Sequence, residues 1–194
     1  MSPYTIAGLA IVSIFYVIYI LKFMSLSGRG ISADRLGSDD KPRSVRRQER
    51  LLQTATLLTA AVQYITLASD NTLLPITTDF HPLQIAGCVL GVTGTAYFAA
   101  AVTAMRDNWR AGIDAEQHTE LVTGGIYRSS RNPAVWGLVG VYAEVTVICP
   151  NWLLDIRSAG TICLVHLEIL KEEAFIADRF GEEYDAYKRR TLRY

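Results

Sequence analysis

The polar stretch Gln117-His-Thr-Glu-Leu-Val-Thr-Gly-Gly-Ile-Tyr-Arg-Ser-Ser-Arg-Asn-Pro133 lies between two strongly apolar parts of the chain. Gly124-Gly125 predicts a turn, because glycine adopts backbone conformations that other residues avoid. Asn132-Pro133 predicts a helix start, because Asn can cap free backbone amides and Pro loses no hydrogen bond in the first helical turn. The stretch therefore indicates a polar surface segment that leads directly into an apolar helix.

The composition on either side of this stretch is that of a membrane protein. Half of the 194 residues are hydrophobic and a fifth are charged, a mixture typical of a polytopic membrane protein with a modest aqueous part. The formal net charge is zero, so total charge favours no partner. The three cysteines lie in or beside apolar runs without a C-x-x-C pair, and three histidines are too few for a histidine-rich centre. We expect no metal site.

Five segments are apolar enough to cross a hydrocarbon core of about 30 Å as helices. They are residues 3–26, 51–68, 83–105, 133–149 and 152–170. A cleavable signal peptide carries its positive charge before the apolar stretch, whereas here the basic residues follow it. The first segment is therefore predicted to be a retained span.

Basic residues alternate with these spans. Arginine and lysine are frequent in residues 27–50, 106–132 and 171–193, and they are absent from residues 69–82. Short loops with this excess face the cytoplasm, so the N-terminus should lie outside and the C-terminus in the cytoplasm. A basic loop could also bind nucleic acid, but the alternation favours topology, and we expect membrane lipids and no nucleic acid as partners.

The predicted fold is all-α, an integral, multi-pass protein of the cell membrane with five transmembrane helices. Residues 1–106 would hold the first three spans and the basic cytoplasmic loop. Residues 107–194 would form a C-terminal half with the last two spans and an amphipathic tail. Pro150-Asn151 predicts a tight outer turn, so the last two spans should run antiparallel.

Glu144 and Arg157 should lie at similar depth across this turn. Charges inside a membrane usually pair or serve function. We expect a structural ion pair, with a transport pathway as the alternative. A pair predicts that Glu144→Gln costs stability and leaves cofactor binding intact.

The antiparallel arrangement brings the end of the fifth span to the level of Asn132. Glu168 and Glu172 are four residues apart and share a helical face there. Carboxylates beside a helix N-terminus provide separate places for positive and negative charge. A zwitterionic ligand with an additional positive charge would suit such a site.

Four ordered motifs in this half carry a resemblance. They are Leu121-Val-Thr-Gly-Gly-Ile-Tyr127, Arg131-Asn-Pro133, Glu172-Glu173 and Phe180-Gly181-x-x-Tyr184-x-x-Tyr187. Together they resemble the isoprenylcysteine carboxyl methyltransferase family and related membrane-bound lipid methyltransferases, over roughly residues 105–194. The resemblance implies S-adenosylmethionine as cofactor, a pocket at the cytoplasmic face of the C-terminal half, and methyl transfer to a lipid-like or prenylated acceptor. In the name-giving members the acceptor is the C-terminal carboxylate of an isoprenylcysteine.

The resemblance also implies which residues bind the cofactor. They are His118, Thr119, Leu121, Val122, Tyr127, Asn132, Pro133, Ala134, Val135 and Glu172. Three positions depart from the family pattern. Thr119 stands where the family has His, so His118 is displaced by one, and Asn132 stands where His is usual. Glu168 occupies the place of an arginine in the eukaryotic carboxyl methyltransferases.

The chemistry of the cofactor fits these residue types independently. Its ammonium and sulfonium need carboxylates or aromatic faces, and its carboxylate needs N–H donors or Arg. Glu168 and Arg131 are the candidates for orienting the acceptor. Methyl transfer from an activated donor needs alignment and exclusion of water, without a metal.

Two other functions remain open at this stage. A membrane reductase of the sterol type, using NADPH, has a related C-terminal layout but usually an Asn-Tyr pair where Ala134-Val135-Trp136 stands. A small carrier could use Glu144 and Arg157 without catalysing a reaction.

Overall fold

The chain is mainly helical in the residues described by the computed structural model, which are 1–31, 36–39, 41–70, 72, 80–109 and 120–194. The long helices are α1 (Pro3–Ser27), α2 (Arg43–Ala68), α3 (His81–Ala104), α4 (Pro133–Ile148) and α5 (Trp152–Phe180), followed by the short α6 (Glu182–Arg190). Two 3₁₀ turns, η1 (Arg106–Asn108) and η2 (Gly125–Arg128), lie before α4. Within these residues the only β-type pairing is one isolated bridge, between Ser130 and Leu192.

Three helices, α1, α2 and α3, are long and apolar enough to cross a membrane. Helix α4 is apolar but has 16 residues, which corresponds to about 24 Å, short of a hydrocarbon core of about 30 Å. Helix α5 is longer, but Asp155, Arg157 and Glu168 interrupt its apolar sequence. The all-helical membrane fold is thus confirmed, whereas a fourth and a fifth span remain predictions.

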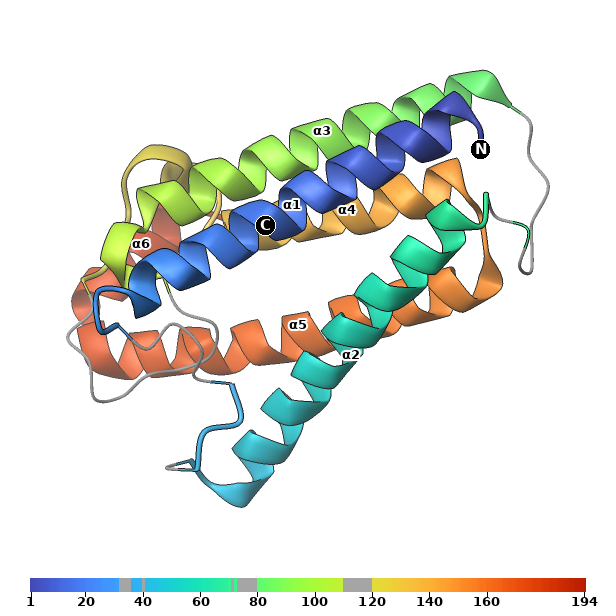
Figure 1. Cartoon of the computed structure of the whole chain (residues 1–194). Helices are drawn as coiled ribbons and strands as arrows, with labels where there is room; N and C mark the ends of the chain where they lie inside the picture. The colour runs from blue at the N-terminus through green and yellow to red at the C-terminus, as the bar shows by residue number, and fades with distance from the viewer. Residues whose placement is uncertain (32–35, 40, 71, 73–79, 110–119) are drawn as a thin grey trace.

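The helices form two layers (Figure 1). Helices α1, α3 and α4 pack together in one, and α2 crosses α5 in the other. Val12, Phe15, Phe98, Val141 and Val145 belong to the buried core of the first layer. A hydrogen bond between the Thr59 and Thr161 hydroxyls, 2.8 Å long and fully buried, joins α2 to α5.

Glycines bring α3 and α4 into backbone contact. A Cβ added to Gly94 would lie 2.9 Å from the Gly137 carbonyl oxygen, and one added to Gly140 would lie 2.9 Å from the Gly94 Cα. Gly87 and Gly91 also face α4, as the small-x-x-x-small spacing predicts: an added Cβ would lie 3.2 Å from the Glu144 carbonyl oxygen at Gly87 and would meet the Glu144 side chain at Gly91. This close packing fixes the direction of α4, and with it the position of the polar segment before it.

The antiparallel turn between α4 and α5 forms as predicted (Figure 1). Its cap is Asn151, whose side-chain oxygen accepts hydrogen bonds from the amides of Leu153 at 2.9 Å and Leu154 at 3.3 Å. Asn caps a helix well because a short side-chain oxygen reaches amides that have no helical partner. The start of α4 and the end of α5 therefore lie at the same end of the bundle.

The predicted ion pair between Glu144 and Arg157 is wrong. Glu144 is fully buried, and neither of its carboxylate oxygens has a hydrogen-bond partner among the residues that the structure describes. It faces the other way, toward Gly91 of α3 and Gly8 of α1, whereas Arg157 donates to the Ala55 carbonyl of α2 at 3.4 Å. Similar depth did not bring the two side chains together, because they point to opposite layers.

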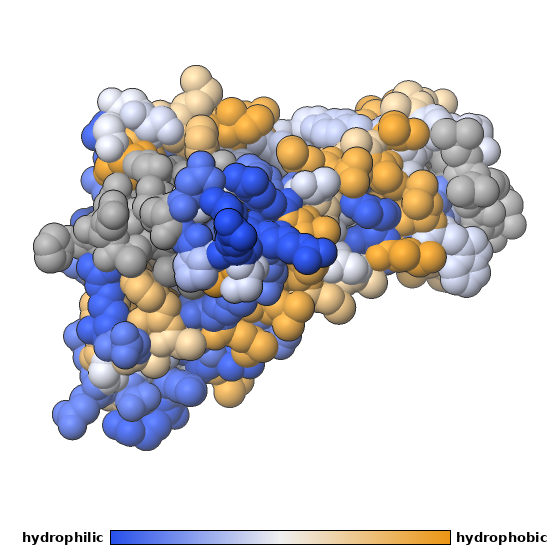
Figure 2. Space-filling model, turned by 90° about the horizontal axis from the view of Figure 1, so that it is seen from below, coloured by the Kyte–Doolittle hydropathy of each residue, from blue (hydrophilic) through white to orange (hydrophobic). Residues whose placement is uncertain are grey.

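Apolar side chains cover much of the outside. Exposed residues of α1 and α3 include Ile6, Ile14, Val17, Leu21, Ile85, Val89 and Val92. Figure 2 shows this hydrophobic surface along the body of the molecule, with hydrophilic residues gathered mainly on the left side and near the middle of the view. Helices α1, α3 and α5 end toward the left side of the molecule (Figure 1). That this side faces the cytoplasm stays a prediction.

Gly137→Ala should lower the melting temperature in detergent by several degrees. The new Cβ would lie 2.7 Å from both the Gly94 carbonyl oxygen and the Phe98 amide nitrogen, and a backbone-limited clash of this kind costs about 1–3 kcal/mol. The control is Gly160→Ala, because no atom lies within 4 Å of its added Cβ; it should leave the melting temperature unchanged or raise it slightly. Equal losses in both variants would show that the α3–α4 contact is not the cause.

Glu144→Gln should leave the melting temperature unchanged or raise it, contrary to the expectation from an ion pair. There is no pair to lose, and the neutral amide avoids the cost of burying a carboxylate. A double-mutant cycle that combines Glu144→Gln with Arg157→Gln measures the coupling free energy between the two side chains directly. A coupling free energy near zero is expected, and a clearly stabilising coupling would restore the pair.

Candidate functional site

The segment before α4 and the C-terminal tail lie side by side at the end of the bundle where α5 finishes. The Arg131 amide donates to the Leu192 carbonyl at 2.9 Å, and the Ser130 hydroxyl donates to the Arg193 carbonyl at 3.0 Å. The Asn132 side-chain amide also donates to the Arg193 carbonyl, at 3.4 Å. The tail is thus tied to the polar segment with which the chain enters α4.

Glu173 is the ionic centre of this arrangement. One carboxylate oxygen accepts from Arg131 Nη2 at 2.9 Å and Nε at 3.1 Å, and the other accepts from Arg193 Nη2 at 2.8 Å and Nε at 3.0 Å. Arg131 also donates to the Thr191 carbonyl. Burial alone would raise the pKa of Glu173, but hydrogen bonds from the two arginines outweigh it and lower the pKa. Glu173 therefore stays ionised and joins α5, the start of α4 and the tail.

Tyr127 lies on η2, just before Ser130 and Arg131. The Tyr187 hydroxyl of α6 donates to the Tyr127 carbonyl at 2.6 Å, and both rings are buried. The pKa of Tyr127 is raised by burial, and further by Tyr187 and by Glu172. The electrostatic effect of Glu172 means that Tyr127 and Glu172, two of the predicted cofactor residues, lie near each other.

Glu172 follows the predicted end of the last span and belongs to a group of acids. Its pKa is raised to about 7, first by burial and then by the negative charges of Glu168 and Glu49, while Lys41 opposes the shift. Glu172 and Glu168 are one turn apart on α5, whereas Glu49 is on α2. We call these three residues the acid cluster.

The other two members of the acid cluster are more deeply buried. Glu49 is fully buried; its oxygens accept from Lys41 Nζ at 2.6 Å and from the Gly37 amide at 2.8 Å. Glu168 is 4% exposed. One of its oxygens accepts a long hydrogen bond, 3.5 Å, from the Gln48 side chain, and Oε1 has no hydrogen-bond partner within the described part of the chain.

The amino end of α4 differs from the prediction in one respect. Asn132 makes no side-chain hydrogen bond to the first turn of α4, so it does not cap the helix; its amide is held by the tail instead. Pro133 does begin the helix, as predicted. The first turn thus has no side-chain acceptor, which suits an anionic ligand group.

The predicted site residues therefore divide into several groups. Arg131, Asn132 and Pro133 lie beside the tail. Glu168 and Glu172 belong to the acid cluster at the same end of the bundle, and Tyr127 lies near Glu172. Leu121, Val122, Ala134 and Val135 are half-buried beside η2 or in the first turn of α4. His118 and Thr119 fall outside the described residues.

Sequence reasoning missed Glu173, Arg193 and Glu49. Adjacent residues of a helix point about 100° apart, so Glu172 and Glu173 face different partners. Their adjacency in the sequence could therefore have predicted that Glu173 has a role separate from that of Glu172. Glu173 faces the tail, and Glu172 faces α2. Glu49 had no such signal, because only the crossing of α2 over α5 brings it to Glu168.

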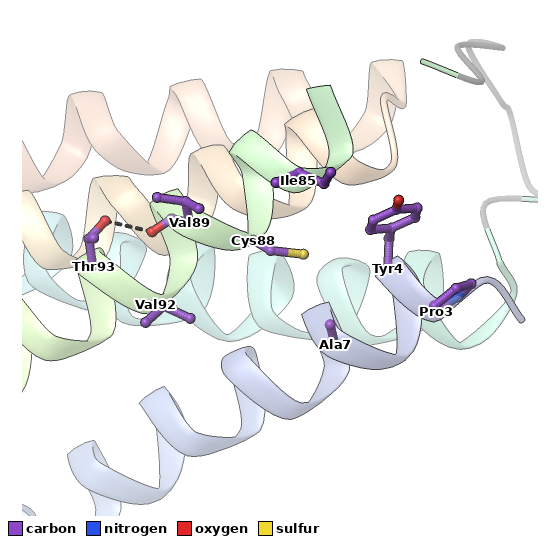
Figure 3. A pocket seen from close by; sticks show the side chains of 8 residues that line it. All are labelled: Pro3, Tyr4, Ala7, Ile85, Cys88, Val89, Val92 and Thr93. Atoms are coloured by element: carbon purple, nitrogen blue, oxygen red, sulfur yellow. Dashed lines mark hydrogen bonds between the residues drawn. The ribbon is translucent and has the colours of Figure 1, made fainter. Parts of the chain in front are cut away.

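The apolar groove between α1 and α3 does not contribute to this site. Figure 3 shows its lining, which is Pro3, Tyr4, Ala7, Ile85, Cys88, Val89, Val92 and Thr93. Its volume is about 460 Å³, and it lies at the opposite end of the bundle, where α1 and α3 begin. The Thr93 hydroxyl already donates to the Val89 carbonyl at 2.7 Å. The groove thus offers a ligand little polar recognition.

Glu173→Gln should destabilise the protein strongly. Glu173 is 8% exposed, and removing one partner of a buried ionic network costs about 3–5 kcal/mol because the other charges lose their compensation. Asp39→Asn is the control, because Asp39 pairs with Arg46 and Arg50 at the surface, where a pair contributes about 1 kcal/mol or less. Melting in detergent measures both. A Glu173→Gln protein as stable as the control would show that the network does not hold this end together.

Comparison with known proteins gives the family. No curated protein matches the chain. The family model described as phospholipid methyltransferase matches residues 83–183, just over half of the chain. The match runs from α3 through η2, α4 and α5 into α6, and so contains Tyr127, Arg131, Asn132, Glu172 and Glu173. The chain belongs to the phospholipid methyltransferase family, a family of membrane methyltransferases that use S-adenosylmethionine and are related to the isoprenylcysteine carboxyl methyltransferases.

Proposed function

We propose that this protein transfers a methyl group from S-adenosylmethionine to an amphipathic acceptor at the cytoplasmic face of the membrane. Membership of the family supports membrane methyl transfer. The observation that carries the proposal further is the proximity of Tyr127 and Glu172 at the end of the bundle where α4 begins without a side-chain cap. Glu172 and the Tyr127 ring favour positive charge, whereas the first turn of α4 favours negative charge, and a zwitterionic cofactor carries both.

The residues present fit this cofactor. The carboxylate of Glu172 and the ring of Tyr127 suit its ammonium and sulfonium, and the first turn of α4 suits its carboxylate. Leu121, Val122, Ala134 and Val135 would supply apolar walls, with His118 and Thr119 as the remaining predicted contacts. When bound, the cofactor supplies an activated methyl group. The protein supplies alignment and exclusion of water.

Arg131 and Glu168 have different roles in this proposal. Arg131 already donates to Glu173 and to the Thr191 carbonyl, so we assign it to positioning the tail and the start of α4. Glu168 keeps an oxygen without a partner, so it is available to an acceptor. Residues 107–194 would then be the catalytic half, and the first three helices would support it in the membrane, with the C-terminus in the cytoplasm.

Two acceptor classes fit an amphipathic site. The isoprenylcysteine carboxylate follows from the resemblance of the C-terminal motifs, and a phospholipid follows from the family description. Both combine a polar head group with an apolar chain that can stay in the bilayer. Methylation assays with an isoprenylcysteine and with a phospholipid as acceptor distinguish the two classes.

The two alternative functions, an NADPH-dependent reductase and a small carrier, are less compatible with the charged residues of this protein. NADPH carries several phosphate charges, and the acid cluster would repel them. A carrier based on Glu144 and Arg157 lacks the ion pair on which that hypothesis depended. Methyl transfer is the function that the site supports best.

Calorimetry of S-adenosylhomocysteine binding in detergent tests the assignment of Glu172. The pKa of this carboxyl is raised to about 7, so it is mostly neutral at pH 6 and mostly ionised at pH 8. If the ionised form holds the ligand ammonium, affinity should rise about tenfold over this interval. Glu172→Gln should weaken binding and abolish the rise.

The matched control is Glu182→Gln, a change at an exposed acid of α6. It should bind as the unchanged protein does at both pH values. Binding of NADPH in place of S-adenosylhomocysteine would overturn the proposed function. Binding that is equally strong at pH 6 and pH 8, before and after Glu172→Gln, would overturn the role of Glu172 alone.

A further inference from the structure

We propose that the last turn of α6 and residues 191–194 dock on anionic phospholipids of the cytoplasmic leaflet, and that the docked lipid holds the tail against the start of α4. The docking surface consists of three consecutive bases at the end of α6 and the exposed side chain of Leu192. We call the three bases, Lys188, Arg189 and Arg190, the basic patch. The surface is separate from the acid cluster, and the lipid bound there would not be methylated.

The basic patch carries charge that the protein does not neutralise. All three side chains are exposed, and none forms an ion pair with a residue that the structure describes. The acids of α6 are confined to its first turn. The first and last residues of this helix are about 12 Å apart along its axis, which exceeds the Debye length of about 8 Å at physiological ionic strength. The patch therefore presents a local positive charge to a partner.

An exposed apolar side chain lies directly beside these charges. Leu192 is 73% exposed, although its backbone is held by the bridge to Ser130 and its carbonyl accepts from the Arg131 amide at 2.9 Å. Bases in the last turn of a helix also complement the helix dipole, but the dipole does not account for an exposed leucine. Bases that flank an exposed apolar side chain are typical of a segment that lies on a membrane surface.

Tyr194 places this surface at the edge of the bilayer. Its hydroxyl is hydrogen-bonded to His166 Nδ1 of α5 at 2.7 Å, and its ring meets the Trp136 ring of α4 edge-on, with the centroids 6.3 Å apart. Trp136 is 47% exposed, as a tryptophan at the membrane interface is expected to be. His166 lies about 6 Å before Leu170, the predicted end of the fifth span. With that span in place, the Tyr194 ring lies just inside the bilayer and the basic patch lies at the head groups.

An anionic phospholipid is the partner that this combination fits. Each base near an anionic bilayer surface strengthens binding about fivefold, so three bases together contribute on the order of a hundredfold. A soluble phosphate ester offers the charge but no apolar layer for Leu192, and a zwitterionic lipid offers the layer but no net charge. An anionic lipid offers both.

The tail connects this surface to the start of α4. Arg131 donates to the Thr191 carbonyl and to Glu173, and the Ser130 hydroxyl donates to the Arg193 carbonyl at 3.0 Å. A lipid that immobilises the end of α6 and Leu192 therefore also immobilises the segment that enters α4. The affinity of a ligand that binds at the start of α4 should then depend on the lipid charge.

Hydrogen exchange of the full-length protein in nanodiscs tests the docking surface without any assumption about catalysis. Nanodiscs of phosphatidylcholine are compared with nanodiscs that also contain phosphatidylglycerol. Backbone amides of residues 128–133 and 188–194 should exchange about threefold more slowly with phosphatidylglycerol at low ionic strength, because docking suppresses local opening. High ionic strength should remove the difference. Soluble glycerol phosphate, added to the phosphatidylcholine nanodiscs, should have no effect.

A variant without the basic patch, Lys188→Gln with Arg189→Gln and Arg190→Gln, should exchange as the unchanged protein does in phosphatidylcholine and should not respond to phosphatidylglycerol. The matched control is Arg43→Gln with Arg47→Gln, which removes exposed bases from the start of α2. It should keep the full response. An equal loss of response in this control would overturn a local docking surface, and so would protection of the same amides by glycerol phosphate or by a DNA duplex.

The affinity for S-adenosylhomocysteine in the same nanodiscs gives a second readout, which rests on the proposed function. Phosphatidylglycerol should tighten binding about threefold in the unchanged protein and leave it unchanged in the variant without the basic patch. Slower exchange with no change in affinity would overturn the coupling between the docked lipid and the start of α4. Exchange rates that do not respond to phosphatidylglycerol would overturn the docking surface. Absence of S-adenosylhomocysteine binding in every lipid would instead overturn the proposed function.

Discussion

The hydrogen bonds that Glu173 accepts from Arg131 and Arg193 hold one end of this protein together. Helix α5, the start of α4 and the tail are far apart in the sequence, and one buried carboxylate connects all three. Two arginines compensate its charge, so the burial that would otherwise neutralise it is tolerated. Tyr127, Asn132 and the first turn of α4 depend on this connection for their positions, because the tail bonds the same segment.

The helix packing determines where this end can form. Glycine contacts fix α4 against α3, and Asn151 turns the chain back so that α5 returns beside the entry to α4. Helix α5 then has two polar faces. One faces the tail through Glu173, and the other faces α2 through Glu168 and Thr161.

Much of the fold follows from local sequence, whereas side-chain partners do not. Apolar length and Asn132-Pro133 predicted the helices and the place where α4 starts, since each depends on nearby residues. The partners of Glu144, Arg157 and Asn132 were predicted wrongly, because they depend on how helices rotate and cross. The contribution of Glu49 to the acid cluster could not be seen for the same reason: residues 49 and 168 meet only after α2 has packed on α5.

The polarity of α5 has a consequence for biogenesis. A helix that carries Asp155, Arg157, Glu168 and Lys171 is too costly to partition alone from the translocation channel into lipid. Its polar groups reach partners on α2, such as the Thr59 hydroxyl and the Ala55 carbonyl, only once the earlier helices are in place. Integration of α5 as the predicted fifth span should therefore be cooperative, because the preceding helices supply polar partners that lipid lacks.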